Sequence, residues 1–153
     1  MANTYTQLFV HYVFAVQNRL FLIHDNFKND LYRYMNGIIV QHGHKLYIVN
    51  GMNDHLHMLV SMSPRQAPSD LMYHIKRSSS LWLNEKKLVP GRFSWQEGFG
   101  AFSIGKSQVS GLVKYIEEQQ EHHKKVSFRE EYLEFLKEND IEFDKRYIFK
   151  PIE

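Results

Sequence analysis

Apolar residues alternate or run together along this chain in a way that predicts four β-strands. Residues 5–17 are rich in aromatic and β-branched types and are typical of a strand buried on both faces. Residues 44–52 and 55–62 are predicted as two further strands, joined by turn-forming asparagine, aspartate and glycine residues. A short apolar stretch at residues 99–104 completes the set.

Helical spacing of apolar residues predicts helices at residues 27–43, 70–87, 107–123 and 128–140. Each predicted helix has a residue typical of helix caps at or just before its start. These residues are Asp25 or Asn26, Ser69, Ser107 and Ser127. The order of elements predicts an α+β, ferredoxin-like (split βαβ, RRM-like) antiparallel sheet, with helices on one face and a C-terminal helical extension. We expect one domain over residues 1–153, with a C-terminal arm at about 127–153.

Two histidines stand out in the third predicted strand. With a period of two, Leu56 and Met58 fall on one face of the strand, while His55 and His57 fall on the other. Alternate residues of one strand lie about 7 Å apart, so two imidazoles could reach the same cation. The alternative is a pair of ordinary histidines on a solvated face, which is the more common reason for such a pattern.

The helix predicted at 107–123 carries a second candidate pair. Its apolar stripe contains Val109, Leu112 and Ile116, and Tyr115 lies to one side of it. Gln119 comes one turn after Tyr115, so the two side chains share a flank of the helix. The tyrosine can be a half-buried packing residue, or it can offer a hydroxyl to the same site as the glutamine amide.

The other histidines have simpler interpretations. His42 and His44 span the end of a helix and the start of a strand, as a helix cap and a turn would. His122 and His123 are adjacent on a helix and diverge by about 100°, so we expect them to complement a helix C-terminus rather than share an ion. The remaining three, His11, His24 and His74, have no partner at a useful spacing.

Composition narrows the class of protein. The chain of 153 residues has no cysteine, which excludes disulfides and thiolate metal sites. We expect a cytoplasmic protein, because the N-terminus makes a poor signal peptide and no stretch approaches the length of a membrane span. Residues 1–116 hold 12 Lys/Arg and 6 Asp/Glu, and residues 117–153 hold 7 and 11. The basic body is compatible with a polyanionic partner.

Candidate contacts to such a partner are chosen here by side-chain chemistry alone. Phosphates could be met by Lys76, Arg77, Lys86, Lys87, Arg92 and Lys106, and bases by Tyr5, Trp95 and Phe99. A solvated face explains each basic residue equally well, and aromatic residues on strands more often belong to the core.

Two motifs together resemble a known family. The run Asp54-His55-Leu56-His57 resembles the HUH motif (histidine, hydrophobic, histidine), and the run YIEEQQEHHKK from Tyr115 resembles the tyrosine helix of single-tyrosine HUH transposases. HUH alone is a weak signal. On a third strand, followed about 60 residues later by Tyr-x-x-x-Gln on a helix, it is a specific one.

The resemblance implies a mechanism. Tyr115 would attack a phosphodiester of single-stranded DNA at the end of a short insertion sequence, forming a 5′-phosphotyrosine and a free 3′-OH. His55, His57 and Gln119 would hold one divalent metal ion, Mg²⁺ or Mn²⁺, and imidazole ligands suit Mn²⁺ at least as well. Such proteins are homodimers with composite active sites, and their DNA is typically a hairpin at the element ends.

Two alternatives remain open. A non-catalytic RRM-like module would bind single-stranded nucleic acid on exposed sheet aromatics, but here the corresponding face of the third strand carries histidines. A domesticated HUH nickase would use the same residues for a host purpose.

Overall fold

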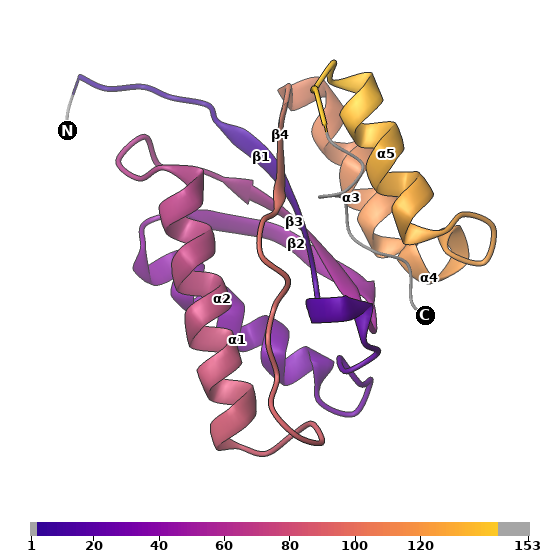
Figure 1. Ribbon diagram of the computed structural model, residues 1–153. Helices are drawn as coiled ribbons and strands as arrows, with labels where there is room; N and C mark the ends of the chain where they lie inside the picture. Colours follow the sequence, from indigo (N-terminus) through magenta and orange to yellow (C-terminus); the bar gives the residue numbers. More distant parts are fainter. Residues whose placement is uncertain (1–2, 144–153) are drawn as a thin grey trace.

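Four antiparallel strands form a single sheet in the computed structural model, which describes residues 3–143 (Figure 1). The spatial order is β2-β3-β1-β4, as expected for the ferredoxin-like arrangement. The strands are β1 (Phe9–Ala15), β2 (Lys45–Met52), β3 (His55–Ser61) and β4 (Gly100–Ile104). Because β1 and β3 are the two central strands, residues placed on them are the most completely covered.

Helices cover both faces of this sheet (Figure 1). One face is covered by α1 (Lys28–Gln41) and α2 (Pro68–Glu85). The other is covered by α3 (Val109–Glu117), α4 (Gln119–His122) and α5 (Phe128–Glu138). Two 3-10 turns, η1 (Gln17–Arg19) and η2 (Lys106–Gln108), follow β1 and β4. The predicted α+β class with a C-terminal helical extension is confirmed.

The first two helices begin differently from the prediction. The cap position of α1 is Phe27, which makes no side-chain cap, so the predicted role of Asp25 or Asn26 is wrong. Helix α2 begins at Pro68, and Ser69 therefore lies inside its first turn rather than at the cap. Proline is favoured at the first helical position because its missing N–H would have no partner there.

The predicted helix at 107–123 is broken into three pieces. Ser107 lies in η2 rather than capping a helix, and α3 ends before Glu118, whose φ of −96° and ψ of 23° interrupt the regular geometry. Helix α4 restarts at Gln119. The cap at Ser127 is confirmed, since its hydroxyl accepts a hydrogen bond from the backbone N–H of Glu130.

The largest apolar cluster lies between the sheet and α1 and α2. Leu56, Met58 and Val60 of β3 all point into it and are fully buried, which confirms the predicted core face of this strand. On the opposite face α5 packs Phe128 and Tyr132 against Val13, Ala15 and Phe102 of the sheet, and Leu136 joins them. The predicted arm at 127–153 thus begins as a packed helix, and residues 144–153 lie outside the described part of the chain.

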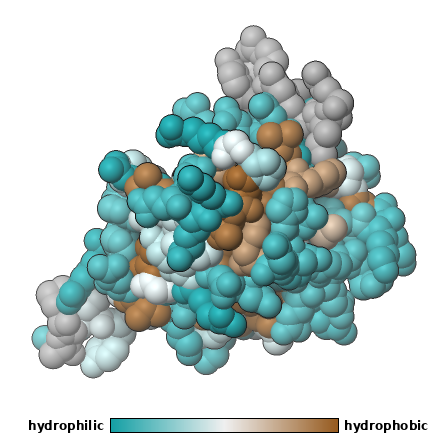
Figure 2. Space-filling view, turned by 90° about the horizontal axis from the view of Figure 1, so that it is seen from below, coloured by the Kyte–Doolittle hydropathy of each residue, from teal (hydrophilic) through white to brown (hydrophobic). Residues whose placement is uncertain are grey.

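Hydrophilic side chains cover most of the face seen from below, with a few apolar ones between them (Figure 2). Among the described residues, the large apolar side chains that remain exposed are Tyr5, Leu8, Leu20, Phe21, Val40, Tyr47, Tyr73, Leu81 and Ile141. No helix within residues 3–143 has the length and apolar character needed to cross a bilayer.

Candidate metal centre and tyrosine site

His55 and His57 lie on the face of β3 that α3, α4 and α5 cover, and they are only 1% and 0% exposed. The alternative of two histidines on a solvated face is therefore wrong. The period of two along β3 places both rings on one side, while Leu56 between them enters the apolar core. In register, His57 is paired with Val13 of β1 and Asn50 of β2, at the centre of the sheet.

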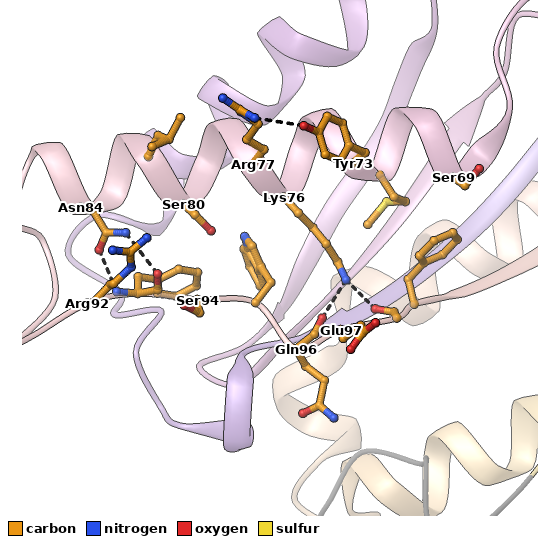
Figure 3. Close-up of a pocket in the computed structure, with 16 residues that line it drawn as sticks. Ser69, Tyr73, Lys76, Arg77, Ser80, Asn84, Arg92, Ser94, Gln96 and Glu97 are labelled. Carbon is orange, nitrogen blue, oxygen red and sulfur yellow. Dashed lines mark hydrogen bonds between the residues drawn. The ribbon is translucent and has the colours of Figure 1, made fainter.

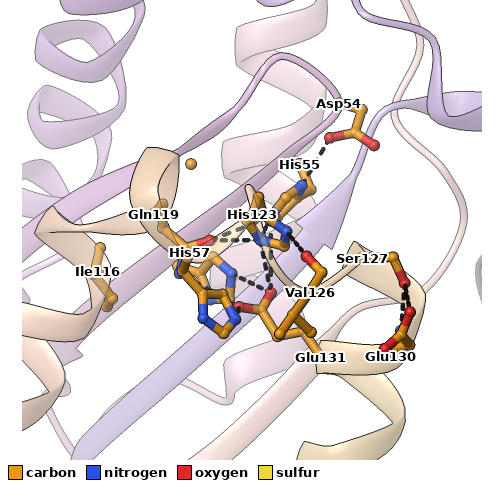
Figure 4. Close-up of polar contacts among 12 residues, drawn as sticks. Asp54, His55, His57, Ile116, Gln119, His123, Val126, Ser127, Glu130 and Glu131 are labelled. Atoms are coloured by element: carbon orange, nitrogen blue, oxygen red, sulfur yellow. Dashed lines mark hydrogen bonds and ion pairs between the residues drawn. The ribbon is translucent and has the colours of Figure 1, made fainter.

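Each of these imidazoles is fixed through its Nδ1 atom, and Figure 4 shows this contact for His55 and Asp54. His55 Nδ1 lies 2.8 Å from Oδ1 of the buried Asp54, which in turn accepts hydrogen bonds from the Arg19 guanidinium at 3.3 Å. His57 Nδ1 lies 2.9 Å from Nε2 of His11, a residue for which the sequence showed no partner. Contacts of this kind set the tautomer and orientation of histidines that bind metals.

Helix α4 brings Gln119 and the residue after the helix, His123, over the two strand histidines. Gln119 is fully buried, and its Oε1 lies 3.4 Å from His55 Nε2 and 3.0 Å from His123 Nε2. His123 Nε2 lies 3.0 Å from His55 Nε2, and His123 Nδ1 lies 2.8 Å from the carbonyl oxygen of Val126. The break at Glu118 ends α3, and the new helix begins with Gln119.

Glu131 of α5 completes the cluster from the other side. Its Oε1 atom lies 2.9 Å from His57 Nε2 and 3.4 Å from His123 Nε2. Its Oε2 atom accepts a hydrogen bond from the Tyr115 hydroxyl and lies 3.0 Å from His122 Nε2. One buried carboxylate thus joins the histidines to the tyrosine.

Burial sets the charge state of two of these groups. Loss of hydration lowers the pKa of His55 to about 4, so its ring is neutral near pH 7. Burial also raises the pKa of the Tyr115 hydroxyl, and the neighbouring Glu131 carboxylate raises it further. The phenol is therefore held protonated in this arrangement.

The carboxylate and the third histidine influence each other. Burial acts to raise the pKa of Glu131, but hydrogen bonds from His123 and His57 outweigh it and hold the pKa far below its ordinary range. Burial acts to lower the pKa of His123, but the hydrogen bond to Glu131 outweighs it and the pKa is raised. The cluster therefore carries a fixed negative charge among its imidazoles.

The donor atoms of this cluster suit a cation. One donor atom from each of His55, His57, His123 and Glu131 lies within 4.8 Å of the others. Asp54 and the Val126 carbonyl oxygen fix the Nδ1 protons of His55 and His123, so the Nε2 atom of the neutral His55 ring presents a lone pair that would repel a lone pair on His123 Nε2, 3.0 Å away. A cation between them, or a proton on His123, turns this repulsion into attraction.

Tyr115 approaches the histidines of its own chain. Its ring centroid lies 6.0 Å from that of His57, and its hydroxyl lies 3.0 Å from His122 Nε2. Gln119 Nε2 lies 3.4 Å from the same Glu131 oxygen that binds the Tyr115 hydroxyl. The predicted set of Tyr115, His55, His57 and Gln119 is thus brought together within one chain.

Sequence reasoning missed His123 and Glu131. The expectation that His122 and His123 only complement a helix end is wrong, because the two rings diverge to opposite ends of the Glu131 carboxylate. A signal for Glu131 was present. The apolar stripe of α5 runs through Phe128, Tyr132 and Leu136, and an acidic residue three positions after Phe128 lies within that stripe. His42 and His44 do form the helix end and turn that were predicted.

The chain is similar to known proteins in sequence. The sequence profile of the family described as IS200-like transposases matches residues 4–119. The ISDra2 transposase TnpA of Deinococcus radiodurans is 25% identical over 118 residues, which cover 74% of this chain and 84% of that protein.

Two solved structures share the fold. A crystal structure described as a transposase of Deinococcus radiodurans R1 superposes with a TM-score of 0.60 at 20% identity, covering 76% of this chain and 94% of that one. A REP-associated tyrosine transposase bound to a REP hairpin superposes with a TM-score of 0.62 at 14% identity, covering 81% and 73%. The family match spans most of the chain, including the histidine pair, the tyrosine and the glutamine, and this protein belongs to the IS200-like transposases.

Proposed function

We propose that this chain, as a single HUH domain acting in the cytoplasm, cleaves and rejoins single-stranded DNA at the ends of a mobile element, with Tyr115 as nucleophile. The observation that carries the proposal is the contact between Glu131, the Tyr115 hydroxyl and His57, which joins a nucleophile candidate to a cluster of metal-binding groups in one site. Metal-assisted cleavage of a phosphodiester by a tyrosine needs these two parts side by side.

We propose that His55, His57 and Gln119 hold one divalent metal ion, with His123 and Glu131 as further ligands. The convergence of their donor atoms and the neutral His55 ring support this. Imidazole nitrogens favour Mn²⁺ over Mg²⁺, which prefers oxygen ligands. A bound ion supplies positive charge for the scissile phosphate.

The chain's own residues account for the proton of the nucleophile. Glu131 Oε2 accepts the hydrogen bond of the Tyr115 hydroxyl, so it is placed to take that proton as the tyrosine oxygen bonds to phosphorus. The bond from phosphorus to the 3′-oxygen breaks, and that oxygen leaves as a 3′-OH after taking a proton from solvent. The resulting 5′-phosphotyrosine keeps the energy of the ester for rejoining to another 3′-OH.

The DNA partner is proposed to be a hairpin with a single-stranded flank, by analogy with the REP hairpin bound to the structural neighbour. The resemblance also implies a homodimer with composite active sites. The present structure instead supports a site formed within one chain, because Tyr115 lies near the histidines of its own chain. We retain the homodimer and propose that each chain can assemble its own site.

The RRM-like alternative receives no support from the geometry. That reading needs an open sheet face with exposed aromatics. Here helices cover both faces, and the face carrying His55 and His57 is buried.

The test is formation of a covalent protein–DNA adduct. Single-stranded DNA covering both flanks of the gene is incubated with protein and Mn²⁺, Mg²⁺ or a chelator, and is then run on a denaturing gel. We expect an adduct with the metal, none with the chelator, and none in Tyr115→Phe. The matched control is Tyr47→Phe, which removes a hydroxyl from an exposed tyrosine outside the site.

An adduct that persists in Tyr115→Phe would assign the nucleophile to another of the nine tyrosines. Absence of any adduct, with DNA still bound, would replace strand transfer by simple binding.

A further inference from the structure

A groove of about 570 Å³ lies on the opposite side of the sheet from the tyrosine site, between α2 and the loop at 92–99 (Figure 3). Its rim on α2 carries Tyr73 and Arg77, and Arg92 lies on the loop. Arg92 lies next to Asn84 of α2. Asn84 is about 10 Å from Arg77 along the helix axis. The groove therefore presents cations at more than one point along its length.

The loop that forms one wall is held to α2 by side-chain hydrogen bonds. Asn84 binds both the N–H and the carbonyl oxygen of Phe93, at 2.7 and 3.1 Å. The Trp95 indole donates to the Ser79 hydroxyl at 2.9 Å. The Lys76 ammonium donates to two loop carbonyl oxygens, at 2.8 and 2.5 Å. The groove is therefore formed before any ligand arrives, which reduces the entropy lost on binding.

The charges at the groove are unbalanced. Its lining contains Lys76, Arg77 and Arg92 but only one acidic residue, Glu97. Among residues 3–143, no carboxylate lies within ion-pair distance of either arginine. Arg77 donates one hydrogen bond to the Tyr73 hydroxyl, and its remaining donors are available to an anion. Guanidinium groups bind phosphate through paired hydrogen bonds.

The groove also offers an aromatic surface beside these cations. Tyr73 is 56% exposed, and its hydroxyl is oriented by Arg77. An exposed aromatic ring next to arginines is the combination on which single-stranded nucleic acids stack their bases and rest their phosphates.

One wall of the groove ends at β4, the edge strand of the sheet. The loop of this wall continues into β4 at Gly100, which is paired with Val13 of β1, and Val13 is paired with His57. Two strand spacings amount to about 10 Å across the sheet. A nucleic-acid strand that leaves the groove and passes around the β4 edge to the opposite face would therefore be two strands away from the row of residues that contains the HUH pair.

We propose that this groove binds the single-stranded flank of the DNA substrate, with phosphates on Arg77 and Arg92 and a base on Tyr73. The proposal rests on the proposed function for the identity of the polyanion, and it assigns a DNA contact surface apart from the histidine and tyrosine site.

The test is binding of a fluorescein-labelled oligothymidine strand of about 12 nucleotides, measured by anisotropy over a range of salt concentrations. The variants are Arg77→Gln, Arg92→Gln, the double variant and Tyr73→Ala. Arg33→Gln is the matched control, because Arg33 is an exposed arginine on α1 that already pairs with Asp30 at 2.8 Å. Arg77→Lys keeps the charge without the paired hydrogen bonds.

We expect the double arginine variant to weaken binding about tenfold at low salt and to reduce the slope of log affinity against log salt by about 1.4, or about 0.7 for each lost phosphate contact. Arg77→Lys should keep the slope, Tyr73→Ala should weaken binding with the slope unchanged, and Arg33→Gln should match the unchanged protein. Equal affinity and slope in the double variant and the control would overturn the proposal.

The covalent adduct distinguishes this failure from failure of the proposed function. With saturating DNA the double variant should form the Tyr115 adduct as fast as the unchanged protein. If the double variant binds DNA more weakly but the unchanged protein never forms an adduct, the groove is a DNA-binding surface and the strand-transfer proposal fails.

Discussion

Both faces of the central strands are buried, but one of them carries three histidines among its apolar residues. On one face Leu56, Met58 and Val60 pack against α1 and α2 in an apolar cluster. On the other face His11, His55 and His57 lie beneath α3, α4 and α5. Both sets alternate along the same strands, so sequence position alone decides which face a side chain joins.

The difference identifies the face with the histidines as the candidate for chemistry. Burying polar groups costs free energy unless they are hydrogen-bonded, and within residues 3–143 every buried side-chain nitrogen and oxygen has a partner. The polar groups of the histidine face therefore all have hydrogen-bond partners. The other face of β3 carries apolar residues instead. The proposed metal ion and nucleophile would give these polar residues a function, since four of their donor groups could hold a metal ion.

The apolar face should dominate stability. Leu56→Ala leaves a cavity in the fully buried cluster, and we expect it to lower the free energy of unfolding by about 3 kcal/mol. Val40→Ala, at a position on α1 that is 59% exposed, should change it little. Urea unfolding measures both. A loss for Leu56→Ala as small as that for Val40→Ala would show that this face is not the principal core.

The histidine face should make stability depend on pH. The pKa values of His55 and His11 are lowered by burial from 6.5 to about 4 and about 3, so the unfolded chain binds more protons than the folded chain below pH 6.5. Stability should therefore fall as the pH drops below 6.5, by about 2 kcal/mol for His55 alone between pH 7 and 5. The raised pKa of His123 acts in the opposite direction.

Urea unfolding with a chelator present, at several pH values between 7 and 5, measures this dependence. An unfolding free energy that stays constant or rises toward pH 5 would contradict the burial of neutral imidazoles.

The hydrogen bond from His55 to Asp54 should tune metal binding. Asp54→Asn removes the charge that orients the His55 ring through Nδ1, and we expect Mn²⁺ affinity to fall about tenfold. Asp25→Asn is the control, because Asp25 is an exposed acid far from the cluster in sequence. Calorimetric titration measures the Mn²⁺ affinity of both variants. Equal affinities would show that Asp54 does not contribute to metal binding.

The cap of α5 should have the smallest effect. Ser127→Ala removes the hydroxyl that accepts from the Glu130 N–H and should cost about 1 kcal/mol of unfolding free energy. Ser107→Ala is the matched control, since Ser107 lies in η2 and caps no helix. If the two serines behave alike in urea unfolding, the difference between the two helix starts has no energetic weight.

Most of the fold could be predicted from local patterns. The strands at 44–52 and 55–62 were found because alternation and turn residues are short-range signals, and β2 and β3 differ from them by a residue at most. Helix starts were less predictable. A serine or aspartate before a helix is common, and at Ser69 and Ser107 the backbone took another course, through Pro68 and through a 3-10 turn.

The site was only partly predictable for a related reason. His55 and His57 are close in sequence, and Tyr115 and Gln119 are one turn apart, so each pair was visible locally. Glu131 lies 74 residues from His57, and only the packing of α5 against the sheet brings them to 2.9 Å. Contacts between distant residues of this kind leave little trace in a single sequence, apart from an acid within an apolar stripe.

Calorimetric titration of the purified, metal-free protein with Mn²⁺ at pH 7 is the most direct test of the proposed metal centre. We expect one ion to bind per chain, with binding lost in His57→Ala and kept in His24→Ala, since His24 lies against Phe27 rather than in the cluster. If the unchanged protein binds no ion, or if His57→Ala binds as well as His24→Ala, then the histidine face is a structural hydrogen-bond network and not a metal centre.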